Sequence, residues 1–114
     1  AIGPYSAYRE ANGLLFISGQ LPINPASGEI ESSDIKEQTK QSLKNIGAIL
    51  EENGISYDKV IKTTCFLADI NDFIAFNEIY AEFFKTPYPA RSAFAVKDLP
   101  KKAKIEIEII AQKG

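Results

Sequence analysis

Two segments near the C-terminus carry the side chains best suited to chemistry. Pro89-Ala90-Arg91-Ser92 places one arginine before a short apolar strand, and Lys104-Ile105-Glu106-Ile107-Glu108-Ile109 alternates charge with isoleucine. Arginine suits a planar carboxylate because its fixed fork donates two parallel charge-assisted hydrogen bonds. A carboxylate nearby could take up and return a proton. The two segments together indicate a pocket for a small anionic acid.

The residues alone also allow a purely structural interpretation of these side chains. Arg91 could pair with a surface acid, and Glu106 and Glu108 alternate with isoleucine as in any half-exposed strand. For Glu108 we keep that interpretation. Cys65 lies in a buried-strand pattern, so we expect a core thiol and not a nucleophile.

Composition excludes several classes of protein. The chain has 114 residues, 45% hydrophobic and 25% charged, which predicts one globular domain over residues 1–114. A net charge of −2 without a basic stripe argues against nucleic acid, and no apolar run approaches the roughly 20 residues that span a bilayer. The absence of histidine removes histidine-dependent triads and common zinc sites. The single cysteine fits a reducing compartment, so we expect a cytoplasmic protein with no membrane partner.

Local patterns predict the elements that must position these residues, in the order β-β-α-β-α-β-β. They are a hairpin over 8–19 that turns at Asn12-Gly13, a helix from Ser33-Asp34 to Gly54, a buried strand over 60–67, a helix capped by Asn71 or Asp72, and strands over 92–96 and 104–111. Adjacent strands joined across a helix run parallel, so the sheet should be mixed. Two helices shield only one face, and we expect another subunit to cover the other.

Short motifs follow one another in a fixed order along the chain. They are Gly3-Pro4-Tyr5-Ser6, Ser18-Gly19-Gln20, QTKQSLKNI over 38–46, Lys62-Thr63-Thr64, Asp72-Phe73 with Asn77 and Tyr80, Pro-Ala-Arg-Ser, and Leu-Pro-Lys before Lys-Ile-Glu-Ile-Glu. In this order and spacing, the sequence resembles the reactive intermediate deaminase family, also called the RidA or YjgF family. The resemblance runs from end to end.

The resemblance implies both a fold and an activity. The fold is α+β and chorismate-mutase-like, with a mixed β-sheet and two helices packed on one face. It assembles as a homotrimer with a barrel-like centre and clefts between subunits. Family members hydrolyse enamines and imines such as 2-aminoacrylate, 2-iminopropanoate and 2-iminobutanoate, which arise from pyridoxal-phosphate dehydratases. The products are 2-oxo acids and ammonia, and the family uses no metal or organic cofactor.

The resemblance also assigns site residues. Arg91 would bind the substrate carboxylate, and Glu106 would guide the attacking water or shuttle its proton. Four further positions match residues that line the family's cleft: Tyr5, Ser18, Gly19 and Asn77. Ala93 stands in the pocket wall where many bacterial relatives have a cysteine, which excludes a thiol-dependent mechanism at that position.

Two alternative functions stay open. A non-catalytic module that binds 2-oxo acids or related metabolites would need Arg91 but not Glu106. An RNA-cleaving inhibitor of translation is a further activity attributed to some relatives, and the acidic net charge makes it the weaker alternative.

Overall fold

Five strands and two α-helices follow one another in the computed structural model, which describes residues 3–114. They are β1 (Tyr8–Ala11), β2 (Leu14–Gln20), α1 (Ile35–Glu52), β3 (Val60–Leu67), α2 (Phe73–Phe83), β4 (Ala90–Ala95) and β5 (Ile105–Gln112). The sheet has the order β1-β2-β5-β3-β4, in which β3 and β4 run parallel and the other neighbours antiparallel. The predicted element order and the mixed sheet are therefore confirmed.

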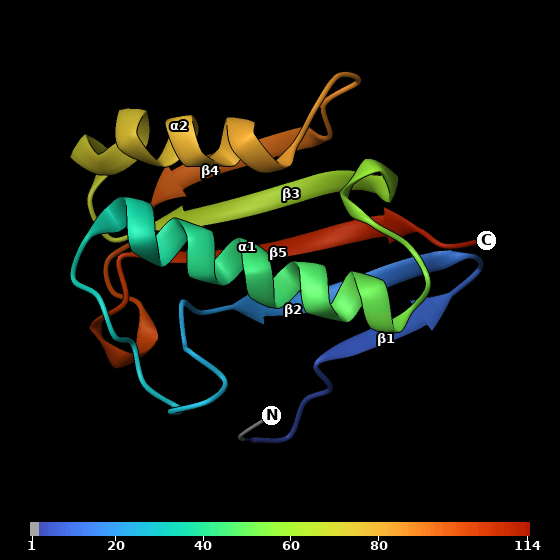
Figure 1. Ribbon diagram of the computed structural model, residues 1–114, viewed down its shortest axis with the longest axis horizontal. Coiled ribbons are helices and arrows are strands. Elements are labelled where there is room, and N and C mark those ends of the chain that lie inside the picture. The colour runs from blue at the N-terminus through green and yellow to red at the C-terminus, as the bar shows by residue number, and fades with distance from the viewer. Residues whose placement is uncertain (1–2) are drawn as a thin grey trace.

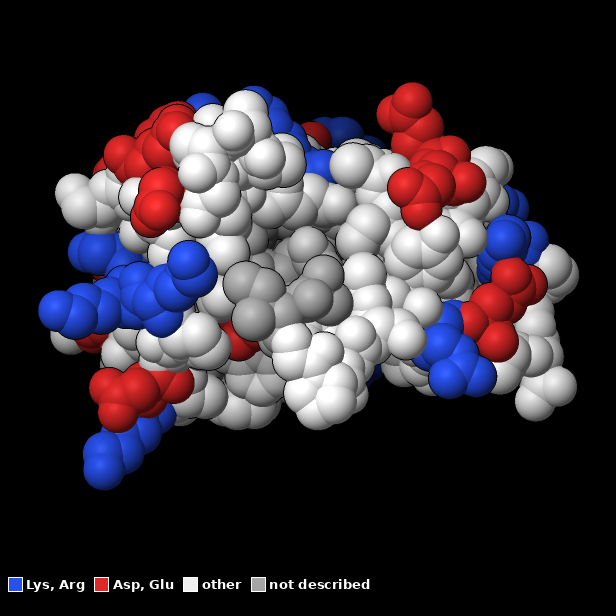
Figure 2. Space-filling model, turned by 90° about the horizontal axis from the view of Figure 1, so that it is seen from below, with Lys and Arg blue, Asp and Glu red and all other residues white. Residues whose placement is uncertain are grey.

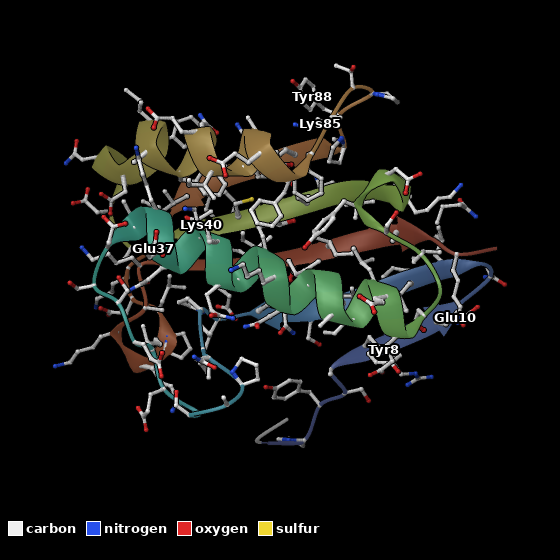
Figure 3. The ribbon with its side chains drawn as sticks, in the orientation of Figure 1. Tyr8, Glu10, Glu37, Lys40, Lys85 and Tyr88 are labelled. Carbon is white, nitrogen blue, oxygen red and sulfur yellow. The ribbon has the colours of Figure 1, made fainter. Side chains whose placement is uncertain are left out.

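The hairpin of β1 and β2 turns where the sequence predicts it. Asn12 and Gly13 both have positive φ, at 53° and 77°, as a tight two-residue turn requires. Tyr8, labelled in Figure 3, donates its hydroxyl hydrogen bond to Glu52 at 2.5 Å and thereby ties β1 to the end of α1.

Helix α1 begins and ends at the predicted residues. The Asp34 side chain accepts a hydrogen bond from the Glu37 backbone N–H at 3.0 Å, which satisfies one free donor of the first turn. Gly54 follows the helix with a φ of 75°, a left-handed conformation that glycine adopts readily. An apolar stripe is buried against the sheet: Ile35, Leu43, Ile46 and Leu50.

Helix α2 begins at the predicted place, because its N-cap is Asp72, one of the two residues expected to cap it. The side chain of Asp72, however, makes no capping hydrogen bond. The side chain of Asp69 instead accepts from the Asn71 N–H at 2.9 Å, because a short 3-10 turn precedes the helix and shifts the capped position. The predicted aromatic stripe is confirmed, with Phe76, Tyr80 and Phe84 buried and Phe73 and Phe83 packed partly against the core.

Both helices lie on one face of the sheet (Figure 1). Along β5, Ile105, Ile107 and Ile109 are buried beneath the helices, whereas Glu106 and Glu108 alternate with them and lie on the opposite, helix-free face. The helix-free face also exposes Phe16 and Phe94, whose exposed fractions are 40% and 45%. That another subunit covers these rings stays a prediction.

Arg91 lies inside a strand, which corrects the expectation that it precedes one. Strand β4 begins at Ala90, and Arg91 pairs in register with Thr63 of β3. The parallel pairing with β3 holds this stretch extended, so the strand starts before the first apolar residue that the pattern could identify.

Candidate active site

The structure distributes the predicted site residues over two clusters. The first, which we call the arginine cluster, consists of Arg91, Asn77 and Ala93 and lies where β4 meets α2. The second, the glutamate cluster, consists of Glu106 near the start of β5, Ser18 and Gly19 near the end of β2, and Tyr5 from the segment before β1.

In the arginine cluster, Arg91 faces the helices from the edge strand. Its Nη1 donates a hydrogen bond to Oδ1 of Asn77 at 2.7 Å. A hollow of ≈ 380 Å³ opens beside them, between α2 and the start of β4. Figure 3 labels Tyr88, which lines this hollow, and Lys85 in the loop between α2 and β4. Its lining is Asn77, Tyr80, Ala81, Tyr88, Pro89 and Arg91. Ala93 pairs with Cys65 and packs against the core, on the same face as Arg91.

Aromatic rings of α2 also contact Arg91, and sequence reasoning missed this. The guanidinium carbon lies 4.8 Å from the centroid of the Tyr80 ring, 5.3 Å from that of Phe73 and 5.7 Å from that of Phe76. The sequence pattern assigned these rings to the helix core. The spacing of Phe73 and Tyr80, four residues before Asn77 and three after it, is the signal that could have found the cluster, because residues three and four apart share one helix face.

The glutamate cluster surrounds a hollow of ≈ 730 Å³, lined by Tyr5, Ser18, Gly19, Leu21, Ile23, Pro100, Lys101 and Glu106. Gly19 lies directly against Glu106: a Cβ at this position would collide with the Glu106 carboxylate. The strand pairing of β2 with β5 shifts register between Ile17 and Gln20, which brings the Gly19 backbone to this place. Gly19 therefore leaves room for the carboxylate to rest on β2, and a side chain at this position would displace it.

The environment of Glu106 suits a proton-transfer group. Partial burial is the main cause that raises the pKa of the Glu106 carboxyl above its ordinary value, and the negative charge of Glu108 adds to it. Within residues 3–114, no side chain or backbone group donates a hydrogen bond to this carboxylate. The carboxylate is thus available to a molecule in the hollow.

The neighbours of Glu106 contribute in different ways. Ser18 uses its hydroxyl to donate a hydrogen bond to the Ser6 carbonyl at 2.6 Å, which holds the N-terminal segment beside β2. Tyr5 is 56% exposed at the rim of the hollow. Lys101, the lysine of the Leu-Pro-Lys motif, also lines the hollow, with a left-handed backbone at φ 57°, although the sequence did not identify it as a site residue.

Arg91 and Glu106 do not meet within one chain. Arg91 pairs in register with the buried Thr63 and contacts α2, so it points to the helix-covered face. Glu106 pairs with Phe66 and lies on the helix-free face. Within a single chain, Arg91 and Glu106 therefore lie on opposite faces of the sheet.

Cys65 is a core thiol, as the strand pattern predicts. It is fully buried, and that burial raises the pKa of the thiol to about 11, while Thr63 and Arg91 oppose the shift. Because the thiolate is the nucleophilic form, this residue is chemically inert at neutral pH.

The described residues were also compared with the requirements for a metal site and for a membrane-spanning helix. Within residues 3–114, no three His, Cys, Asp or Glu side chains come close enough together to hold a metal ion. Neither helix of this described part of the chain combines the length and the apolar character that crossing a bilayer requires.

Comparison with known proteins gives consistent matches over nearly the whole chain. The family model described as Endoribonuclease L-PSP matches residues 1–113. AldR of Lactococcus lactis, named as a proposed regulator, is 55% identical over 98% of this chain and 89% of its own. The human 2-iminobutanoate/2-iminopropanoate deaminase is 48% identical over all of this chain and 83% of its own. Among solved structures, Escherichia coli TdcF with bound serine superimposes with a TM-score of 0.94 at 43% identity, covering 100% of this chain and 91% of that one.

Proposed function

The chain belongs to the Endoribonuclease L-PSP family, the RidA/YjgF family whose motifs its sequence carries, and on that premise we propose that it is a 2-iminobutanoate/2-iminopropanoate deaminase. Its substrates would be short-lived 2-imino acids and their enamine tautomers, including 2-aminoacrylate. The products would be 2-oxo acids and ammonia. The observation that carries the proposal is that, within residues 3–114, Arg91 has no acidic partner, while the same chain carries a glutamate, Glu106, with a raised pKa.

Arg91 would bind the substrate carboxylate. Within the described residues 3–114, no Asp or Glu oxygen lies within ion-pair distance of its guanidinium, so the positive charge is not already neutralised. Two N–H groups of the fork would donate to the two carboxylate oxygens and fix the direction of the neighbouring C=N group. For a substrate this reactive, orientation supplies much of the catalysis.

Glu106 would move the protons. As the carboxylate it takes a proton from water while the water oxygen bonds to the imine carbon, which gives a tetrahedral carbinolamine. It returns that proton to the imine nitrogen to complete the carbinolamine, and then passes the hydroxyl proton of the carbinolamine to the same nitrogen, so that the C–N bond breaks and ammonia leaves as the C=O bond forms. A raised pKa favours this two-way role because it lies closer to the operating pH.

The active site would be completed between subunits of a chorismate-mutase-like homotrimer with a barrel-like centre. Two features support this assembly. The helix-free face exposes Phe16 and Phe94, and Arg91 and Glu106 point to opposite faces of the same sheet. A heterologous interface, in which the β4 edge of one chain meets the helix-free face of the next, would bring them together.

A coupled assay tests the function. Threonine dehydratase or an amino-acid oxidase would generate the imine in place, and release of the 2-oxo acid would be timed with and without this protein. Acceleration is the expected result. An unchanged rate, with the protein folded and oligomeric, would refute the deaminase proposal.

The pH dependence of turnover should follow the ionisation of Glu106. Its carboxylate form is the base, so kcat/KM is expected to fall as the pH drops through the raised pKa. In Glu108→Gln the neighbouring negative charge is removed, which lowers the pKa of Glu106 and moves this acid limb to lower pH. The measurement is kcat/KM against pH for both proteins, corrected for spontaneous imine hydrolysis. Coincident limbs would show that Glu106 is not the titrating base.

A metabolite-binding regulatory module is the alternative, favoured by the name of AldR. The arginine cluster has its own hollow and would bind a 2-oxo acid without Glu106. Binding of 2-oxobutanoate without any acceleration of imine hydrolysis would support this alternative.

RNA cleavage is a second alternative, favoured by the description of the family model. On the face seen in Figure 2, lysines and arginines lie beside acidic side chains at both ends, with uncharged side chains between them, which is unlike a continuous phosphate-binding track. RNA binding that weakens steeply with added salt would support it. A cytoplasmic location stays a prediction.

A further inference from the structure

The orientation of Arg91 is set by helix α2. Four residues of that helix, Phe73, Phe76, Asn77 and Tyr80, contact the guanidinium, and their spacing of three and four residues places them on one helix face. The three ring centroids lie between 4.8 and 5.7 Å from the guanidinium carbon, within the range of cation–π attraction.

Asn77 differs from the rings because it contacts the edge of the guanidinium. Its Oδ1 accepts from Nη1 at 2.7 Å. Arginine has five N–H donors in one plane, so this bond leaves the others free. A neutral amide also fixes the position of the guanidinium without neutralising its charge, whereas an aspartate of the same shape would form an ion pair with it.

Tyr80 has the shortest ring distance and is itself held in place. Its hydroxyl and that of Thr63 form a hydrogen bond of 2.8 Å in the core. Thr63 is the residue of β3 that pairs with Arg91 of β4. The ring beside the guanidinium is therefore fixed to the neighbouring strand at the same level of the sheet.

We propose that Asn77 and Tyr80 are positioning residues that hold the Arg91 guanidinium in the orientation that receives a carboxylate. The aromatic rings occupy the guanidinium face, and Asn77 occupies one donor at its edge. The remaining donors are left for the bidentate contact. This inference rests on the function proposed above and changes the expected role of Asn77 from a substrate contact to a contact with the arginine.

Substitutions at Asn77 separate positioning from direct substrate contact. Affinity for 2-oxobutanoate, a stable product, would be measured by titration calorimetry, together with KM and kcat. Asn77→Ala is expected to weaken 2-oxobutanoate binding roughly threefold. Asn77→Asp should weaken it by about tenfold or more, because the new carboxylate competes for Arg91. For each variant, KM should rise by about the same factor. Asn71→Asp, the same change at an exposed position before α2, is the control and should bind normally. Normal binding by Asn77→Asp would overturn the proposal.

Tyr80 is tested by a conservative pair. Tyr80→Phe keeps the ring and should stay within about threefold of the parent affinity, whereas Tyr80→Leu loses the ring and should bind on the order of tenfold more weakly. Equal affinities of the Phe and Leu variants, both folded, would contradict a role for the ring. If Tyr80→Leu does not fold, the binding affinities of the Asn77 variants still test the proposal.

A spectroscopic measurement keeps this inference separate from the deaminase proposal. Arg9 is the only other arginine in the sequence, so an Arg9→Lys variant assigns the Arg91 side-chain N–H signals in a ¹H–¹⁵N NMR spectrum. Hindered rotation and ring-current shifts of these signals are expected in the parent protein. Both should decrease in Tyr80→Leu, and the hindered rotation should be lost in Asn77→Ala. Freely rotating signals in the parent would refute positioning whether or not the protein hydrolyses imines.

Discussion

An Arg91→Ala variant is expected to release 2-oxo acid no faster than the protein-free reaction, while it remains folded. The guanidinium lies at an edge strand and is solvent-exposed, so its loss leaves no cavity in the core. Without it, the substrate carboxylate has no bidentate partner and the imine is no longer oriented. The coupled dehydratase assay measures the rate, and circular dichroism checks the fold.

An Arg91→Lys variant adds a second test of the same residue. Lysine keeps the charge but not the planar fork, so kcat/KM should fall by roughly tenfold to a hundredfold. Lys85→Ala is the matched control: it removes a cation from the loop that leads into β4 and should retain the parent activity (Figure 3). Full activity in a folded Arg91→Ala protein would refute the proposed role.

The second large effect is expected in Glu106→Gln, which should lower kcat by roughly a hundredfold to ten-thousandfold and leave 2-oxobutanoate affinity nearly unchanged. The amide has the same shape and still fits against Gly19, but it cannot accept a proton from water. The two quantities are measured separately, by single-turnover kinetics and by calorimetry.

Glu108→Gln is the matched control for that variant. It lies two positions along the same strand and face, and at neutral pH it should keep most of the turnover. If Glu106→Gln loses binding as strongly as turnover, the residue contributes to affinity and the proton-transfer role is wrong.

The fold could be predicted closely because each element has a strong local signal. Asn12-Gly13 requires positive φ, Asp34 caps a helix, and the isoleucines of β5 alternate with charge. The misplaced boundary is the start of β4, which is fixed by pairing with β3 and which a local pattern does not reveal. At α2 the predicted N-cap residue Asp72 is right, but the hydrogen bond of the first turn is accepted by Asp69, because a short 3-10 turn precedes the helix.

The candidate site could be predicted residue by residue, but not as a geometry. Motifs identified Arg91, Asn77 and Glu106, yet only the register of β4, β3 and β5 determines that the first two share a face and the third does not. The sequence pattern predicts core positions for the rings around Arg91, because an aromatic stripe on a helix is typical of a core and does not by itself indicate contact with an arginine. Lys101 belongs to the Leu-Pro-Lys motif, but its place beside Glu106 depends on the path of a loop, which the motif does not reveal.

The opposite orientation of Arg91 and Glu106 has a consequence for genetics. If a working site takes its arginine from one chain and its glutamate from another, two inactive proteins should rescue each other. Co-expressed Arg91→Ala and Glu106→Gln chains would recover about a quarter of parental activity in a randomly mixed ring, because that share of the interfaces receives both intact residues. The two inactive variants would then complement each other. Co-assembled chains that stayed inactive would instead show that Arg91 of one chain and Glu106 of another do not complete one site.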